Sequence, residues 1–380
     1  MKKTIGVLGV GAIGTLIAND LARTFNGNIV LMSRDVNKIK HLEKKNISLR
    51  SADVSNINSL VKAFRGVDVV IHAVHHEFNL NVMNACLKSK SHYVDLGGLY
   101  HYTKKQLKLN NKFQNARLTA VLGMGAAPGI TNVLAKYASS FLDKVNNVEM
   151  KIGSIDKSTF KVTSPLSNTY SIQTILEEFS WKPAKFIDNK VRFIEPISDR
   201  EEYKFPDPIG VQKLQSTIHS EIATLPYTLK AKNVSFKIGF DDDFVNKIKK
   251  LKELGFISDE NIGFNGKEFK IKQISVEILK RLPKTVIDKI NQYEIIRVIL
   301  EGTKSGKHKQ IILDAHVKGI KETGDKDTAA PASIVAQMIA NEKINKRGVY
   351  PPELIVPGKY FFNELSKRKI YIFINERNKL

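Results

Sequence analysis

The feature that most restricts the fold of this chain is a glycine pattern near its N-terminus. Gly9, Gly11 and Gly14 form G-x-G-x-x-G directly after the apolar stretch from Thr4 to Leu8, and a segment with helical periodicity follows. In that context Gly9 permits a tight turn, Gly11 lets the backbone approach a pyrophosphate, and Gly14 lets the helix pack closely. The alternative is that these glycines serve only a tight turn between the strand and the helix. The pattern predicts a dinucleotide site at Gly9, Gly11, Ala12, Ile13 and Gly14.

The first 125 residues repeat one unit, a short apolar run followed by a turn and a segment with helical periodicity. This repeat is typical of an α/β fold with a doubly wound parallel sheet. The predicted strands are Thr4 to Leu8, Asn28 to Met32, Ile47 to Arg50, Val67 to His72, Tyr93 to Leu96 and Thr119 to Leu122. The predicted helices are Ile13 to Thr24, Val36 to Lys44, Ile57 to Phe64, Leu80 to Lys88, Lys104 to Asn115 and Thr131 to Phe141. We assign residues 1–130 to a Rossmann domain.

The pattern changes from about Val145, where strands such as Asn147 to Ile152 and Ile295 to Leu300 alternate with helices. This mixture predicts a second, α+β domain over residues 131–330, which we expect to bind substrate and to form a homodimer interface. Residues 331–380 form a tail with an amphipathic helix from Pro331 to Asn341 and another helix from Tyr360 to Arg368. We expect this helical tail to return onto the Rossmann domain.

The chain is strongly basic, with 60 Lys and Arg against 38 Asp and Glu and a formal charge of +22. Such a charge would suit nucleic acid or another anionic partner. The lysines are scattered, however, as in the predicted helix around Phe244 to Lys252, where they surround one apolar face. We therefore expect a lysine-rich surface without a nucleic-acid partner. A basic surface that helps to collect an anionic substrate or cofactor remains the alternative.

Nothing in the sequence indicates export or a membrane. The N-terminus runs from Lys2 and Lys3 into a strand instead of an apolar leader, and no apolar stretch reaches the about 18 residues of a spanning helix. Cys86 is alone, which suits a reducing compartment. We expect a soluble, cytoplasmic protein.

The residues after the second predicted strand bear on which nucleotide binds. Ser33 and Arg34 suit a 2′-phosphate, which a guanidinium can grip with its planar fork, so NADP is favoured. Asp35 keeps NAD open, and Arg34 has the alternative of a solvent-facing loop residue. Asp53 and Val54, after the third strand, are expected near the adenine, although Asp53 suits equally a cap for the helix beginning near Ser55.

Residues after the fourth strand are expected beside the cofactor. Ala73 and Val74 are predicted to line its path. His75, His76 and Glu77 follow, but no matching cluster elsewhere in the sequence supports a metal site, so we interpret them as polar loop residues and predict no metal.

Several longer stretches make the chain resemble the saccharopine dehydrogenase family, including its lysine dehydrogenase and saccharopine reductase members. They are the fingerprint and the stretches His92 to Gly98, Gly123 to Asn132, His219 to Pro226 and Thr328 to Met338. The Gly-x-Gly-x-x-Pro-Gly stretch that ends in Thr131 and Asn132 is the most specific of them. The resemblance implies hydride transfer between a nicotinamide and a carbon attached to an amine nitrogen, through an imine.

That chemistry needs a base, because an ammonium must lose a proton before its nitrogen can assist hydride transfer. Asp95 ends the fifth strand at the ligand-binding edge of the sheet, where it suits a base or a partner for a cationic amine. A cap for the following turn is the alternative. Gly97, two residues later, is expected to contact the cofactor.

In the second domain, Tyr170, His219 and Glu221 are expected to close over the substrate, with Ser220 between the last two. His219 suits proton exchange and Glu221 an amino group, while both also suit the end of a surface helix. The stretch from Lys237 to Asp243 lacks the arginine expected in lysine dehydrogenase members, which leaves the exact substrate open.

Three hypotheses follow. The first is an NADP-dependent enzyme of the saccharopine-forming type, which interconverts an imine and a secondary amine of an amino-acid substrate. The second is a lysine 6-dehydrogenase, which oxidatively deaminates the terminal amine. The third is an NADP-binding regulatory protein without turnover, because a fold alone does not fix a function.

Overall fold

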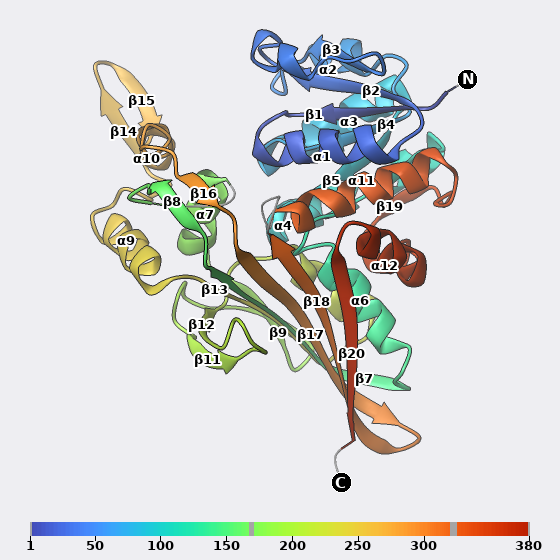
Figure 1. Cartoon of the computed structure of the whole chain (residues 1–380), viewed down its shortest axis with the longest axis vertical. Coiled ribbons are helices and arrows are strands. Elements are labelled where there is room, and N and C mark those ends of the chain that lie inside the picture. The colour runs from blue at the N-terminus through green and yellow to red at the C-terminus, as the bar shows by residue number, and fades with distance from the viewer. Residues whose placement is uncertain (1, 167–170, 320–324, 379–380) are drawn as a thin grey trace.

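The computed structural model describes residues 2–166, 171–319 and 325–378. Its N-terminal part contains a seven-stranded, entirely parallel sheet in the order β3-β2-β1-β4-β5-β6-β19 (Figure 1). The strands are β1 (Thr4–Leu8), β2 (Asn28–Ser33), β3 (Ile47–Ser51), β4 (Val69–His72), β5 (His92–Asp95), β6 (Thr119–Val121) and β19 (Gly348–Tyr350). The order reverses between β1 and β4, which is where ligands bind in doubly wound sheets. The predicted Rossmann fold is confirmed.

Helices connect these strands, mostly where the periodicity predicted them. They are α1 (Ala12–Thr24), α2 (Ile57–Phe64), α3 (Asn79–Ser89), α4 (Leu99–Leu107), α5 (Asn110–Asn115) and α6 (Ile130–Ser139). Two predictions differ from the structure. The segment from Val36 to Lys44 forms only a 3₁₀ turn, η1 (Asn37–Leu42), and the single helix predicted from Lys104 to Asn115 is divided into α4 and α5.

The second part is built on a nine-stranded mixed sheet, as predicted for an α+β fold. Seven strands run in the order β10-β9-β13-β7-β17-β18-β20, and β12 joins β13 to carry the hairpin with β11. The strands are β7 (Lys144–Asp156), β9 (Ala184–Ile187), β10 (Lys190–Phe193), β11 (Glu201–Lys204), β12 (Val211–Gln215), β13 (Asn233–Gly239), β17 (Gln292–Lys304), β18 (Lys307–Gly319) and β20 (Ile370–Asn378). The short segments η3 (Ser220–Ala223) and α8 (Leu225–Thr228) precede β13.

A smaller unit extends from this sheet on the side of the Rossmann domain (Figure 1). It contains the strand pair β8 (Thr159–Val162) and β16 (Val286–Lys289), the hairpin β14 (Asn261–Phe264) and β15 (Lys267–Lys270), and the helices α7 (Ile172–Ser180), α9 (Asp242–Glu253) and α10 (Ile271–Leu279). The apolar faces of α7 and α9 meet in a separate cluster that contains Leu176, Phe179, Val245 and Ile248. This packing fixes the position of α7, which contributes residues to the candidate active site.

The tail returns to the Rossmann domain and then leaves it again. Helix α11 (Lys326–Ala340) packs against α1 and the strands β1, β4 and β5, and β19 extends the parallel sheet beside β6. After the 3₁₀ turn η4 (Pro352–Leu354) and α12 (Gly358–Lys367), the final strand β20 pairs with β18 of the second sheet. Pro331 lies inside α11 instead of starting it, and the helix is buried on nearly all sides instead of along one stripe.

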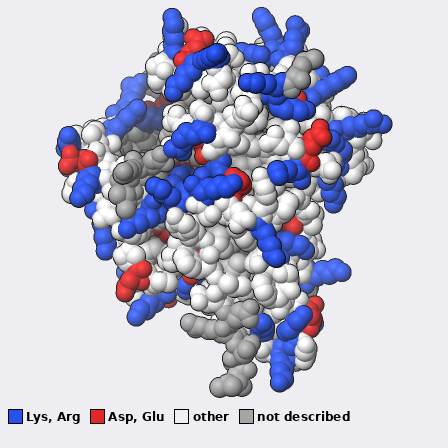
Figure 2. Space-filling view, turned by 45° about the vertical axis from the view of Figure 1, so that its right-hand side comes forward, with Lys and Arg blue, Asp and Glu red and all other residues white. Residues whose placement is uncertain are grey.

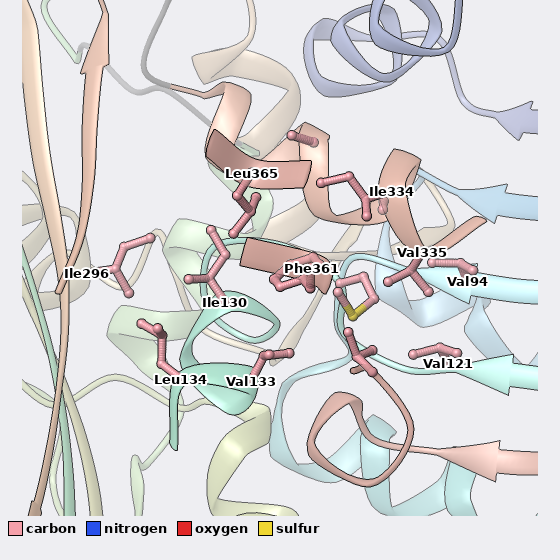
Figure 3. Packing of buried hydrophobic residues seen from close by; sticks show 14 of the residues in the cluster. Val94, Val121, Ile130, Val133, Leu134, Ile296, Ile334, Val335, Phe361 and Leu365 are labelled. Atoms are coloured by element: carbon pink, nitrogen blue, oxygen red, sulfur yellow. The ribbon is translucent and has the colours of Figure 1, made fainter. Parts of the chain in front are cut away.

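The domain boundaries predicted after residues 130 and 330 fall at the start of α6 and inside α11, and they stay a prediction. The two sheets share one continuous hydrophobic core. Figure 3 shows Ile130, Val133 and Leu134 of α6 lying between Ile296 of the second sheet and the strands β5 and β6. This shared core holds the edge of the Rossmann sheet against the second part.

Basic side chains cover the face seen in Figure 2 in many separate places, with acidic ones between them, as the scattered lysines predicted. Within the described ranges, no helix is both long and apolar enough to span a membrane.

Candidate active site

The turn between β1 and α1 has the form of a pyrophosphate site. Gly9 has a φ of +91°, and a β-carbon on Gly14 would lie 1.9 Å from the Gly9 carbonyl oxygen, so both positions require glycine. A β-carbon on Gly11 would have no atom within 4 Å. Gly11 caps α1 without a side-chain hydrogen bond, and the first turn of α1 contains no acid. The space beside Gly11 and the free N–H groups of Ala12, Ile13 and their neighbours therefore fit a phosphate group.

Ala73 and Val74 lie directly against this turn, as predicted. A β-carbon on Gly9 would be 2.8 Å from the carbonyl oxygen of Ala73 and 2.5 Å from Cγ2 of Val74. Both residues are half-buried, at the reversal point of the sheet.

The loop after β2 presents Arg34 to solvent. The Ser33 hydroxyl donates to the carbonyl of Asp35 at 3.1 Å, and the Asp35 carboxylate accepts from the N–H of Asn37 at 3.1 Å. The Arg34 guanidinium makes no hydrogen bond or ion pair with any residue that the structure describes. Because Asp35 is engaged within its own loop while Arg34 is not, this geometry suits a 2′-phosphate better than a ribose hydroxyl.

Asp53 holds a turn and does not cap a helix. Its Oδ1 accepts from the hydroxyl of Ser55 at 2.7 Å and from the N–H of Ser55 at 3.0 Å, and these bonds lower the pKa of Asp53. The cap of α2 is Asn56, so the capping alternative for Asp53 is wrong. Val54 is half-buried, and its carbonyl accepts from the amide of Asn81 at 3.5 Å.

Asp95 is enclosed by hydrogen-bond donors. It is 1% exposed, and burial raises the pKa of Asp95, although hydrogen bonds from Gly123, Gln106, Tyr93 and Gly97 oppose this. Oδ1 accepts from the N–H groups of Gly97 (3.0 Å) and Gly123 (2.6 Å), and Oδ2 accepts from Tyr93 (2.8 Å), Gln106 (2.5 Å) and Asn79 (3.4 Å). With both oxygens occupied, the turn-holding alternative is favoured over proton transfer.

His219 and Glu221 lie together, as predicted, but they are buried instead of at a surface. The His219 ring stacks on Phe236 with centroids 3.6 Å apart, and its Nδ1 is 3.3 Å from Oε2 of Glu221. Oε1 of Glu221 accepts from the hydroxyl of Thr131 at 2.9 Å. The pair is therefore fixed to the first turn of α6.

A second carboxylate, which the sequence did not single out, completes this group. Oε1 of Glu178 on α7 lies 3.8 Å from Nε2 of His219. Burial lowers the pKa of His219, but Glu221 and Glu178 outweigh it and raise the pKa overall. His219 is therefore protonated over a wider pH range than an ordinary histidine, which suits a proton donor.

The neighbouring acid, Glu177, contacts both histidines that follow β4. Its Oε2 lies 3.2 Å from Nε2 of His75 and 3.0 Å from Nε2 of His76. Burial opposes ionisation here, yet hydrogen bonds and charge raise the pKa of His75 to about 9 and lower that of Glu177 to about 2. Two consecutive acids among the apolar residues Ile172, Ile175, Leu176 and Phe179 were the available signal for this site.

Several buried oxygens near His219 have no hydrogen-bond partner in the described part of the chain. They are Oε1 of Gln215, Oγ1 of Thr217 and Oγ of Ser220. Unpaired buried polar atoms cost free energy and are typical of a site that receives a ligand. A β-carbon on Gly97, which has a φ of +128°, would lie 3.8 Å from Oγ of Ser220, so this segment faces the turn after β5.

The remaining predicted positions are placed as follows. Tyr170 lies outside the described residues. In the stretch from Lys237 to Asp243, Lys237 pairs with Glu201 at 3.0 Å, and Asp242 pairs with Arg200 at 2.6 Å. The fold therefore brings Arg200 next to this stretch, although the stretch itself contains no arginine.

Two models of known protein families match the chain. The saccharopine dehydrogenase NADP binding domain matches residues 5–121, and the saccharopine dehydrogenase C-terminal domain matches residues 125–370.

Characterised relatives and a solved structure extend this likeness. Carboxynorspermidine synthase of Vibrio alginolyticus is 24% identical over 397 residues, with 93% of this chain and 92% of that protein covered. Carboxyaminopropylagmatine dehydrogenase of Synechocystis sp. is 22% identical, with 93% of both chains covered. The apo saccharopine dehydrogenase (L-Glu forming) of Saccharomyces cerevisiae has a TM-score of 0.74 at 15% identity, covering 99% of this chain and 100% of that one, which shows the shared fold.

Proposed function

The chain belongs to the saccharopine dehydrogenase family, and we propose that it joins a di- or polyamine to an aldehyde-bearing amino acid as a secondary amine. Family membership makes it an NADP-binding oxidoreductase that acts on a carbon bonded to an amine nitrogen. The substrate is our proposal. This proposal retains the amino-acid substrate and the imine chemistry that the family resemblance implied.

The observation that carries this proposal is the acidic group around His219. In a chain with a formal charge of +22, the Glu221 side chain is 0% exposed and that of Glu178 is 6% exposed. Burying two carboxylates is costly unless cations accompany them. Two carboxylates around one imidazole make this buried group acidic, which suits a substrate that carries an ammonium.

The relatives support an amine substrate of this kind. Carboxynorspermidine synthase and carboxyaminopropylagmatine dehydrogenase are both named after polyamine-like compounds that carry a carboxyl group. Such a compound combines a carboxyl group with cationic amines. Our proposal assigns the cationic end to Glu178 and Glu221.

The reaction balances as a condensation followed by a reduction. The primary amine and the aldehyde lose water and form an imine, and the imine then takes up a hydride at carbon and a proton at nitrogen. NADPH supplies the hydride when it is bound beside Gly11 and the α1 N-terminus. His219, whose pKa is raised, supplies the proton, while Glu221 and Thr131 hold its ring in position.

The test follows the absorbance of NADPH with α,ω-diamines, agmatine and lysine, each combined with amino acids that carry a side-chain aldehyde. We expect oxidation of NADPH only when amine and aldehyde are both present. Glu178→Gln should raise the KM for the diamine by roughly tenfold or more, the size of one lost charge-assisted contact. Glu253→Gln, an exposed acid at the end of α9, is the matched control and should leave the KM unchanged.

Other outcomes favour the other hypotheses. Reduction of NADP⁺ by lysine alone would indicate a lysine 6-dehydrogenase. Binding of NADPH without turnover on any pair would indicate a regulatory protein. A KM for the diamine that Glu178→Gln leaves unchanged would contradict the assigned amine site. The homodimer stays a prediction, which light scattering of the purified protein tests.

A further inference from the structure

A second cluster, separate from the amine group at His219, connects the two parts of the molecule. His75 and His76 come from the loop after β4 of the Rossmann domain, and Glu177 comes from α7 of the second part. His75 and Glu177 are 102 residues apart in sequence. One ligand atom from each of these two residues and one from His76 lie within 4.8 Å of one another.

A hydrogen bond to Glu177 explains the position of the His75 ring but not that of the His76 ring. Nε2 of His75 is hydrogen-bonded to Oε2 of Glu177 at 3.2 Å. Nε2 of His76 approaches the same oxygen to 3.0 Å, yet it forms no hydrogen bond with any described residue. The His76 side chain is 6% exposed, so water does not compensate this atom from bulk solvent. A cation shared by the three groups would explain why both rings point at one oxygen.

The spacing fits a transition-metal ion. With bonds of about 2.0–2.1 Å from zinc to nitrogen and oxygen, neighbouring ligand atoms of a tetrahedral site lie roughly 3.3 Å apart. The observed nitrogen to oxygen distances of 3.0 and 3.2 Å are close to this value. Two imidazoles and one carboxylate are a donor set that zinc accepts, whereas calcium and magnesium prefer oxygen ligands alone.

The surroundings orient the ligands as metal sites do. The other nitrogen of the His75 ring, Nδ1, lies 3.4 Å from a carboxylate oxygen of Glu77, which can accept its proton when Nε2 binds a metal. A metal-binding imidazole commonly has a carboxylate on its second nitrogen, which fixes the ring and its tautomer. The rings of Tyr102 and Trp181 stand edge-on to His76 with centroids at 4.9 and 6.3 Å, and they form an aromatic wall.

We propose that His75, His76 and Glu177 bind a divalent transition-metal ion, with zinc as the best fit. Because its ligands come from the Rossmann domain and from α7, a bound ion links the two parts beside the site. Three protein ligands leave a fourth position open for water.

The test uses the full-length protein, freed of metal with a chelator, and zinc ions alone as the probe. Calorimetric titration or competition with a chromogenic chelator should give one strong site per chain. His76→Ala and Glu177→Gln should abolish that site. Glu77→Gln, which removes only the outer carboxylate, should weaken it by about 10–100-fold. His308→Ala changes an exposed histidine on β18 and should leave zinc binding as it is.

Two results would overturn the proposal. One is the absence of stoichiometric zinc binding to the unmodified protein, which would reduce the cluster to an ion pair. The other is binding that both His76→Ala and Glu177→Gln retain in full, which would place the zinc on surface histidines. Circular dichroism and thermal unfolding show whether each variant is folded. If His76→Ala does not fold, the conservative variants Glu177→Gln and Glu77→Gln still test the proposal.

Discussion

The hydroxyl of Thr131 donates a 2.9 Å hydrogen bond to Oε1 of Glu221. This bond joins the specific stretch that ends in Thr131 and Asn132 to the stretch that contains His219. The next residue, Asn132, makes a similar bond of 2.8 Å to the buried carboxylate of Glu353. The N-terminal turn of α6 is therefore the anchor that holds the acidic group of the second part against the Rossmann edge.

Thr131→Val tests this anchor, because valine keeps the shape and removes the donor. The buried Glu221 oxygen would lose its partner, at a cost of roughly 1–3 kcal/mol in the free energy of unfolding. Urea denaturation measures this, and Thr163→Val, at an exposed threonine, is the control. Equal stability of both variants would show that Glu221 does not depend on Thr131.

Substitutions in the glycine turn should separate cofactor binding from folding. Gly11→Val has open space around the new side chain, so we expect a folded protein that binds neither NADPH nor NADH. Gly14→Ala would place a methyl 1.9 Å from the Gly9 carbonyl oxygen, and it should cost at least about 1–3 kcal/mol of stability. Fluorescence titration and thermal unfolding measure the two effects. Cofactor binding by a folded Gly11→Val protein would contradict the site.

Arg34 should determine the preference for NADPH over NADH. Its guanidinium is exposed, and Arg34→Ala should reduce the preference by on the order of 1–3 kcal/mol, the value of a charge-assisted bond. The ratio of the two dissociation constants measures it. Arg65→Ala, at an exposed arginine that follows α2, should leave the ratio unchanged. A similar change in both variants would indicate only a general effect of charge.

The parts of the fold that depend on local sequence were predictable. The bounds of β1 and α2 match the prediction to the residue, because alternating or helical apolar patterns and glycine turns act over a few residues. Helix α11 was placed five residues too late because Pro331 was interpreted as a start signal, although the helix tolerates it one turn in. The strand β20 was missed because its stabilising partner, β18, lies more than 50 residues earlier in the chain.

The site was predictable only where one segment supplies it. His219 and Glu221 are two residues apart, and a single stretch predicted both. Glu178 and Glu177 reach their histidines through the packing of α7, which no local pattern describes. Asp95 was placed correctly at the end of β5, but sequence could not show that five donors surround it.

This enclosure changes what Asp95→Asn should do. An amide can accept fewer hydrogen bonds than a carboxylate, and its NH₂ would face donors from Gly97 and Gly123 or from the side chains opposite. We expect the variant to lose roughly 1–3 kcal/mol of stability, while Asp188→Asn, at an exposed aspartate, loses none. An unchanged stability with turnover lowered by two or more orders of magnitude would instead restore Asp95 as the base.

His219 should make stability depend on pH in a defined direction. Its pKa is raised in the folded protein, because Glu221 and Glu178 outweigh the effect of burial, while the unfolded chain has a value of about 6.5. The stabilisation from protonated His219 is therefore complete below about pH 6.5 and is lost as the pH rises through the folded-state value. Deprotonation removes the positive charge that His219 places beside Glu221 and Glu178.

Between about pH 6 and pH 9, the unmodified protein should thus lose more stability than His219→Gln, which has no proton to release. Urea denaturation at a series of pH values measures the two slopes, and His308→Gln, at an exposed histidine, should behave as the unmodified protein does. Parallel slopes for the unmodified protein and His219→Gln would mean that folding leaves the pKa of His219 unchanged, which would contradict this prediction. A stability of the unmodified protein that rises with pH relative to His219→Gln would mean that the buried imidazole is neutral in the folded protein, and then His219 could not supply the proton that the proposed reduction requires.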